Sequence, residues 1–129
     1  MINYGFTREL DIPYKIVIEM AIAALKQEGF GILTEINIME KMKDKLGIDA
    51  RNYIILGACN PPNAYKAILA EENIGLMLPC NVIVYEKGGK TVLSVIRPTV
   101  AMQMIDNMEL HKLAETIEGQ LKKAFDAIQ

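Results

Sequence analysis

The spacing of hydrophobic positions follows two different periods along this chain. Within the first 30 residues it changes from the period of a strand to the period of a helix. Aromatic residues at alternate positions predict a strand over residues 3–9. A helix is expected to follow over residues 13–28, because Pro13 suits a first helical turn and Gly29 suits the end of a helix. Its apolar positions are Ile16, Val17, Met20, Ala21, Ala24 and Leu25. This wide apolar stripe predicts that the helix covers a sheet.

The middle of the chain returns to the strand period. Residues 31–38 alternate in the pattern of a half-buried strand. Residues 39–46 have helical spacing and end at Gly47, which predicts a short helix or a loop excursion. Residues 53–59 form an apolar run that predicts a third strand.

The third strand is expected to lead directly into a helix. Pro61 and Pro62 suit the start of this helix, which the sequence predicts as far as about Glu72, and Asn60 is a good N-cap. Two further runs, residues 81–86 and 91–96, predict a hairpin that turns through Lys87-Gly88-Gly89-Lys90.

A long amphipathic helix is predicted at the C-terminal end, after Pro98. Its apolar stripe consists of Leu110, Leu113, Ala114, Ile117, Leu121, Ala124, Phe125 and Ile128. The long helices are expected to lie on one face of a mainly antiparallel sheet, which predicts an α+β fold. No linker or repeat interrupts residues 1–129, so we expect a single domain.

Charge and composition narrow the classes of function. The formal net charge is -2, tryptophan is absent and the basic residues are interspersed with acidic ones. Nucleic-acid binding is therefore not expected, because it requires clustered Lys and Arg. No signal peptide is evident, and the most apolar stretch, residues 16–25, is too short to span a bilayer and contains Glu19. These features predict a soluble, cytoplasmic protein without a membrane partner.

The two cysteines are the main candidates for chemistry, and an asparagine follows each of them. Cys59 ends the third strand just before a helix N-terminus, where the helix dipole favours a thiolate. One hypothesis is therefore a reactive or ligand-binding thiol. The alternative is a small buried residue that packs a tight turn, as most free cysteines do. Both thiols are expected to be reduced.

Cys80 begins the following strand, and it faces Cys59 if their strands are neighbours. Such a pair can form a redox disulfide or bind a soft metal ion. Two ligands fall short of the four that zinc prefers, unless a dimer supplies each cysteine twice or His111 joins them. The sequence therefore requires no cofactor or metal. His111, the only histidine, is expected to be solvated, and no complete catalytic arrangement of residues is evident.

The Cys59-Asn60 and Cys80-Asn81 pairs also predict a cleft for a small polar ligand. The asparagine amides would orient the ligand at a helix N-terminus, and Gly57 would allow its close approach to the backbone. Glu35 lies on a predicted strand and is either solvated or a buried acid of a pocket.

Three blocks of the chain resemble the bacterial domain of unknown function 302. These blocks are Glu28-Gly29-Phe30-Gly31-Ile32-Leu33-Thr34-Glu35-Ile36, Ile55-Leu56-Gly57-Ala58-Cys59-Asn60-Pro61 and Leu78-Pro79-Cys80-Asn81-Val82-Ile83-Val84-Tyr85-Glu86. The resemblance implies a TATA-binding-protein-like β-α-β(4)-α fold with a short extra helix, and a homodimer. It implies no established activity, and it favours a role for Glu35, which lies within the first block. Asn37 departs from the family pattern, in which an Asp is expected.

The leading hypothesis is a homodimeric small-ligand-binding module that is not an enzyme. Its cleft would be lined by Gly57, Cys59, Asn60, Cys80, Asn81 and Glu35. One alternative is a thiol-redox or soft-metal-handling protein that uses Cys59 and Cys80. A second alternative is a purely structural assembly domain.

Overall fold

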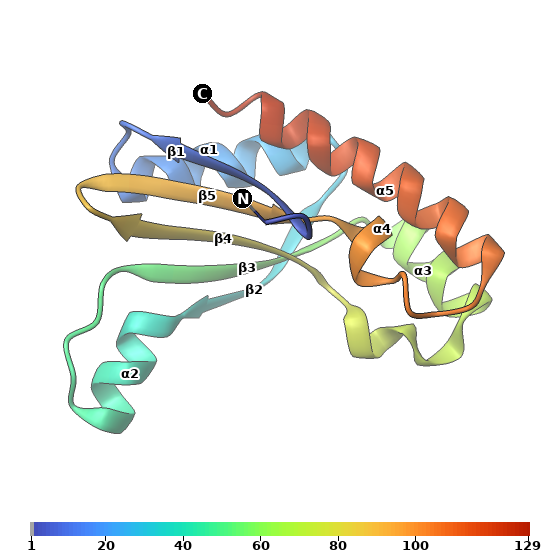
Figure 1. The fold of residues 1–129 in the computed structure, drawn as a ribbon, viewed down its shortest axis with the longest axis horizontal. Coiled ribbons are helices and arrows are strands. Elements are labelled where there is room, and N and C mark those ends of the chain that lie inside the picture. The colour runs from blue at the N-terminus through green and yellow to red at the C-terminus, as the bar shows by residue number, and fades with distance from the viewer. Residues whose placement is uncertain (1) are drawn as a thin grey trace.

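Five strands form one antiparallel sheet in the spatial order β1-β5-β4-β3-β2 (Figure 1). The computed structural model describes residues 2–129. Along the chain the elements are β1 (Gly5–Leu10), α1 (Tyr14–Gln27), β2 (Gly31–Asn37), α2 (Ile38–Leu46), β3 (Tyr53–Cys59), α3 (Pro61–Ala70), the 3-10 helix η1 (Glu72–Met77), β4 (Cys80–Lys87), β5 (Lys90–Ile96), α4 (Pro98–Ala101) and α5 (Met108–Asp126).

The two long helices, α1 and α5, lie on the same side of the sheet, and α2 projects on the opposite side (Figure 1). The core lies between these helices and the sheet. It contains Val17, Ala21 and Leu25 of α1, Ile117, Leu121 and Phe125 of α5, and Leu56, Val82, Val84, Leu93 and Val95 of the central strands. The predicted α+β fold is therefore confirmed.

Local signals in the sequence predicted the bounds of most helices and strands to within two or three residues. Gly29 follows α1 with φ of 86°, a left-handed conformation that ends a helix and that glycine adopts without strain. Asn60 is the N-cap of α3, and its side-chain oxygen accepts a hydrogen bond from the Asn63 amide at 3.3 Å. The hairpin of β4 and β5 turns between Lys87 and Lys90, as predicted.

The prediction of a half-buried second strand was wrong. Strand β2 is an edge strand, and most of its residues are exposed, Leu33 by 65%. The pairing register between β2 and β3 shifts between Ile32 and Thr34, so a bulge interrupts the alternation that the sequence suggested. The short helix predicted after β2 is present as α2, but none of its residues is buried.

The sequence did not predict η1, and it did not separate α4 from the long C-terminal helix. Helix η1 and Met102, the residue after α4, contribute to a second apolar cluster, which also includes α3 and the start of α5. Its buried members are Ala67, Ile74, Met102, Leu110 and Ala114. This cluster fixes η1 and α4 beside the first residues of β4.

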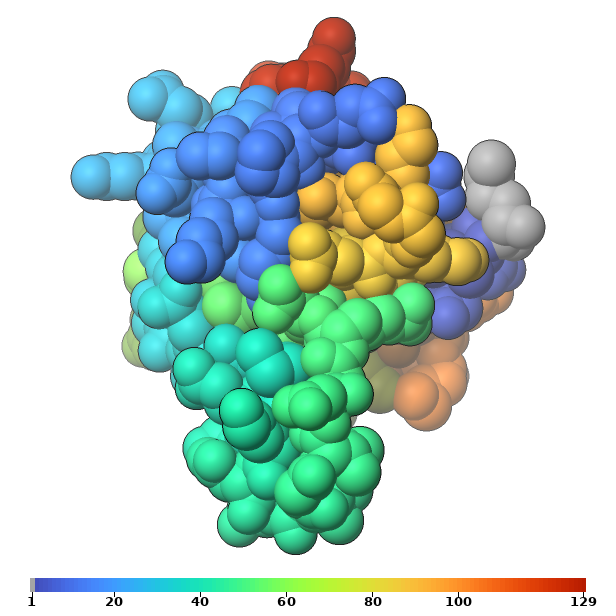
Figure 2. Space-filling model, turned by 90° about the vertical axis from the view of Figure 1, so that its left-hand side faces the viewer, coloured from blue at the N-terminus to red at the C-terminus, as the bar shows by residue number. Residues whose placement is uncertain are grey.

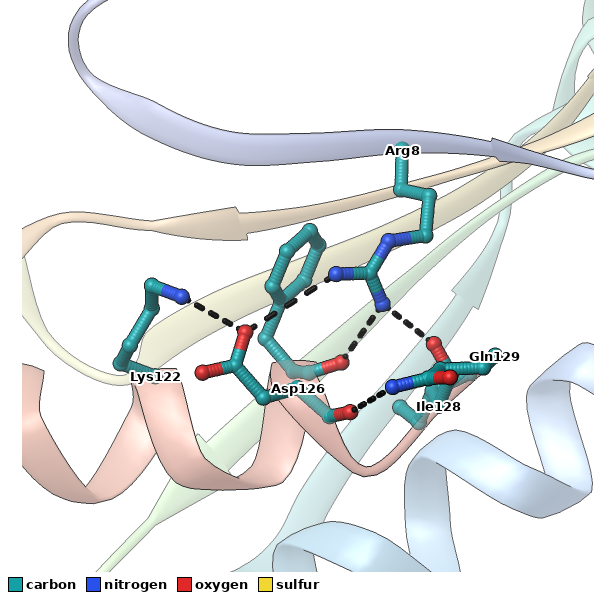
Figure 3. A network of polar contacts seen from close by, with 6 residues as sticks. Arg8, Lys122, Asp126, Ile128 and Gln129 are labelled. Carbon is teal, nitrogen blue, oxygen red and sulfur yellow. Dashed lines mark hydrogen bonds and ion pairs between the residues drawn. The ribbon is translucent and has the colours of Figure 1, made fainter.

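Arg8 of β1 connects the sheet to the C-terminal end of α5 (Figure 3). Its guanidinium donates hydrogen bonds to the carbonyl oxygens of Phe125, at 3.1 Å, and Ile128. It also lies 4.3 Å from the centroid of the Phe125 ring and 3.8 Å from the carboxylate of Asp126. These contacts add a charged donor at the end of the helix, where the Phe125 carbonyl otherwise accepts, within residues 2–129, only from the Ile128 amide.

The Arg8→Met variant is expected to lose about 2 kcal/mol of unfolding free energy, because the two carbonyl groups lose a charged donor. Urea unfolding measures this loss. Lys122→Met is the matched control, since Lys122 pairs with the same Asp126 at 2.6 Å on the surface and bonds to no carbonyl group at the end of α5. The control should lose about 0.5 kcal/mol or less. Equal losses in the two variants would contradict this role of Arg8.

Candidate functional site

The two cysteines lie at the same end of neighbouring strands, as the redox and metal hypotheses require. Cys80 pairs with Ala58, the residue before Cys59, in the register of β3 and β4. Cys80 and Ala58 therefore point to the helix-covered face, while the alternation of β3 directs Cys59 to the opposite face. Both cysteines are free, and both border a cavity of about 20 Å³. This cavity holds about one water molecule and no larger ligand.

Burial changes the acidity of both thiols in the same direction. Burial raises the pKa of Cys59 above its ordinary value. Burial, with a smaller contribution from nearby Cys59, raises the pKa of Cys80 to about 11. This direction is the opposite of the one expected for Cys59 at a helix N-terminus, because desolvation disfavours the thiolate. Both thiols are protonated at neutral pH, whereas redox and metal chemistry use the thiolate.

The surroundings of Gly57 are filled by side chains of this chain. An added Cβ atom would lie 2.2 Å from Oγ1 of Thr34 and 2.7 Å from Cγ of Pro79. Gly57 pairs with Thr34 on β2 and with Asn81 on β4, so it lies in the middle of three strands. Its lack of a side chain allows β2 and the segment before β4 to approach β3.

Cys80 and Asn81 border an open cavity of about 260 Å³. Its other walls come from η1 and the residues after it, from the end of β5 and from α4, and they include Leu76, Leu78, Ile96, Ala101 and Met102. Most of these side chains are apolar. The Cys80-Asn81 pair therefore adjoins a ligand-sized cavity, while Cys59 and Asn60 border only the smaller one.

Glu35 and Asn37 lie on the exposed edge strand β2. The Cα partner of Glu35 is Leu56, and its side chain is exposed. Asn37 is the N-cap of α2, and its side-chain oxygen accepts a hydrogen bond from the Glu40 amide at 3.1 Å. Asn and Asp serve equally well at this position, so the departure from the family pattern keeps the capping role.

His111 is less solvated than predicted. Its Nε2 atom is buried and has no hydrogen-bond partner among residues 2–129. With Thr99, Gln103 and Glu115 it borders a cavity of about 180 Å³. Within the same residues, no group of three or more His, Cys, Asp or Glu side chains is placed to hold a metal ion.

A groove that was not predicted from the sequence lies on the sheet face opposite α1 and α5. This groove has a volume of about 530 Å³, and its walls include Tyr4, Glu9, Arg51, Tyr53, Ile83 and Tyr85. The rings of Tyr53 and Tyr85 stack with centroids 5.2 Å apart, and the Arg51 guanidinium lies 5.0 Å from the Tyr85 centroid. A signal was present in the sequence, because β3 and β4 carry large apolar residues on both faces rather than on one.

None of the helices within residues 2–129 combines the length and the apolar sequence needed to cross a membrane.

Comparison with known proteins agrees with the resemblance seen in the three sequence blocks. A family model described as "Domain of unknown function DUF302" matches residues 6–128. The chain is similar to a crystal structure of an uncharacterized conserved protein DUF302 from Bacillus stearothermophilus, with 31% identity. That similarity covers 98% of each chain, with a TM-score of 0.91. No curated protein matches the sequence.

Proposed function

This chain belongs to the family described as domain of unknown function DUF302, and on this basis we propose that it is a homodimeric, non-catalytic module that binds a small ligand beside Cys80 and Asn81. The observation that carries the proposal is the open, mainly apolar cavity of about 260 Å³ at this corner of the sheet. Cavities of this kind, with a few polar groups in an apolar wall, are typical of small-molecule sites.

The size and walls of the cavity select the class of ligand. An apolar cavity of about 150 Å³ accommodates benzene, so 260 Å³ suits a molecule with one or two rings. The protonated Cys80 thiol is a weak donor, and the exposed Asn81 amide both donates and accepts. We therefore expect an apolar molecule with a single hydrogen-bonding group rather than a charged metabolite.

The proposed site uses only part of the predicted cleft. Cys80 and Asn81 border the larger cavity, and Cys59 and Asn60 lie behind them at the start of α3. Gly57 supports this corner by admitting Thr34 and Pro79. Glu35 lies on the exposed edge strand and borders neither cavity, so it is not part of the proposed site.

Indole is a suitable probe, because it has two rings and one N–H donor. At about ten times its Kd, indole should raise the melting temperature of the wild-type protein by about 5 °C. Ala101→Phe fills the cavity from α4 and should abolish this shift, whereas Ala127→Phe, at an exposed position after α5, should preserve it. Thermal-shift measurements and calorimetric titration provide the readout.

Two results would overturn the proposed site. One is the absence of a shift with indole and with phenol, which has one ring and one hydroxyl group. The other is a shift that persists unchanged in Ala101→Phe. Circular dichroism of both variants verifies that each one folds.

A further inference from the structure

The sheet face opposite α1 and α5 carries an apolar stripe along β3 and β4, although neither long helix covers it (Figure 1). Its cross-strand pairs include Tyr53 with Tyr85, Ile55 with Ile83, and Ile36 with Ile55. An antiparallel sheet with one face in water normally carries polar residues on that face. The pattern therefore indicates that a partner covers it.

Helix α2 contacts little of its own chain apart from β3. It projects from the body of the molecule together with residues 47–52 (Figure 2). None of its nine residues is buried, and Leu46 and Ile48 are exposed by 64% and 49%. A helix of this length gains most of its stability from packing of its apolar side, and here Ile38, Met39 and Met42 are only partly buried.

We propose that a second copy of this chain covers this sheet face, in a two-fold dimer in which α2 of each copy packs beside β1 of the other. This inference rests on the proposed homodimer and identifies the surface through which it forms. Tyrosine and arginine, which are enriched at protein interfaces, line the groove at Tyr4, Tyr53, Tyr85 and Arg51.

The area of the face fits a stable dimer. Five strands spaced about 4.8 Å apart, each of about seven residues, give a face of about 24 by 23 Å. Helix α2 adds a strip about 13 Å long and 10 Å wide. Each copy would then contribute about 700 Å², close to the roughly 800 Å² per partner of a standard interface.

The charges at the two sides of the groove complement each other under a two-fold axis. Glu9 lies on β1, and Arg51 precedes β3, with β5 and β4 between them. Glu9, Val92, Tyr85 and Tyr53 form one cross-strand row, so Arg51 lies close to the end of this row. A two-fold axis parallel to the strands, between β4 and β5, places Tyr53 of one copy opposite Glu9 of the other and brings Arg51, two residues before Tyr53, near the same carboxylate. An isologous interface requires such self-complementarity.

The first experiment measures molar mass by light scattering and sedimentation. The wild-type protein should have about twice the 14.4 kDa mass of the chain. Ile83→Glu and Leu46→Glu should weaken dimerisation by about 100-fold, because each buries an unpaired charge in the interface. Leu69→Glu, at an exposed position of α3, is the matched control and should remain dimeric.

A charge exchange tests the orientation of the axis. Arg51→Glu should weaken the dimer by about tenfold, because it lies near the partner's Glu9, and the double variant Glu9→Arg/Arg51→Glu should restore it. Circular dichroism confirms folding of each variant.

The possible failures are distinguishable. A wild-type dimer that is unaffected by Ile83→Glu and Leu46→Glu would overturn this surface and leave the proposed homodimer intact. A monomeric wild-type protein would overturn both the proposed surface and the proposed homodimer, and it would indicate that a different partner covers this sheet face. Indole binding is measured independently of either result.

Discussion

Gly57→Ala is expected to lower the free energy of unfolding by about 3 kcal/mol, one of the largest effects of a single methyl group in this protein. The new Cβ atom would lie 2.2 Å from Oγ1 of Thr34 and 2.7 Å from Cγ of Pro79. Rotation of Thr34 relieves only the first contact, because the Pro79 ring is held by its own backbone. Strands β2 and β3, or the segment before β4, must therefore move apart.

Urea and thermal unfolding measure the effect, which corresponds to roughly 10 °C in melting temperature. Gly119→Ala is the matched control, since nothing lies within 4 Å of its added Cβ atom and it stands inside α5. The control should gain up to about 1 kcal/mol, because alanine is a better helix former than glycine.

A second variant assigns the cause of the loss. Thr34→Ala removes the closer atom, so it should recover part of the stability in combination with Gly57→Ala. A Gly57→Ala protein as stable as the wild type would show that this corner is loosely packed, contrary to the structure.

The second large effect is a loss of stability at alkaline pH that depends on Cys80. Its thiol has an ordinary pKa of 9.0, and burial raises the pKa to about 11 in the folded protein. Between these two values the unfolded chain loses the proton and the folded protein keeps it. The contribution of Cys80 is therefore complete below about pH 9 and is lost as the pH rises through about 11, with a total of about 3 kcal/mol.

Comparison with Cys80→Ala isolates this contribution from other groups that titrate above pH 9. Urea unfolding at pH 8 and pH 10.5 should show that the wild-type protein loses about 2 kcal/mol more than the variant. Removal of the side chain lowers the free energy of unfolding by the same amount at both pH values, so this loss cancels when the two changes with pH are compared. Cys59→Ala should retain most of the pH dependence, because burial is the larger cause of the Cys80 shift. Identical pH profiles for wild type and Cys80→Ala would contradict the burial of an intact thiol.

The sequence by itself determined the elements whose signals are local. The hairpin from β4 to β5 was predicted from two apolar runs and the Gly88-Gly89 turn. Its two strands are consecutive along the chain, so their pairing depends on no distant segment. The start of α3 was predictable because it depends on a local contact, the hydrogen bond that the Asn63 amide donates to the Asn60 side chain. The side of α5 that faces the core follows from helical periodicity. The family resemblance supplied the expected β-α-β(4)-α order of strands and helices.

The tertiary structure decided everything that depends on contacts between distant segments. The register of β3 with β4 places Ala58, not Cys59, opposite Cys80, and the sequence could not show this. The filling of the space beside Gly57 depends on β2, and the cavity beside Cys80 depends on η1 and α4. Exposure of β2 and α2 follows from their place at the edge of the sheet rather than from their composition. Burial raises the pKa of both thiols, because desolvation is a property of the whole packed environment and is not encoded in residues next to a cysteine.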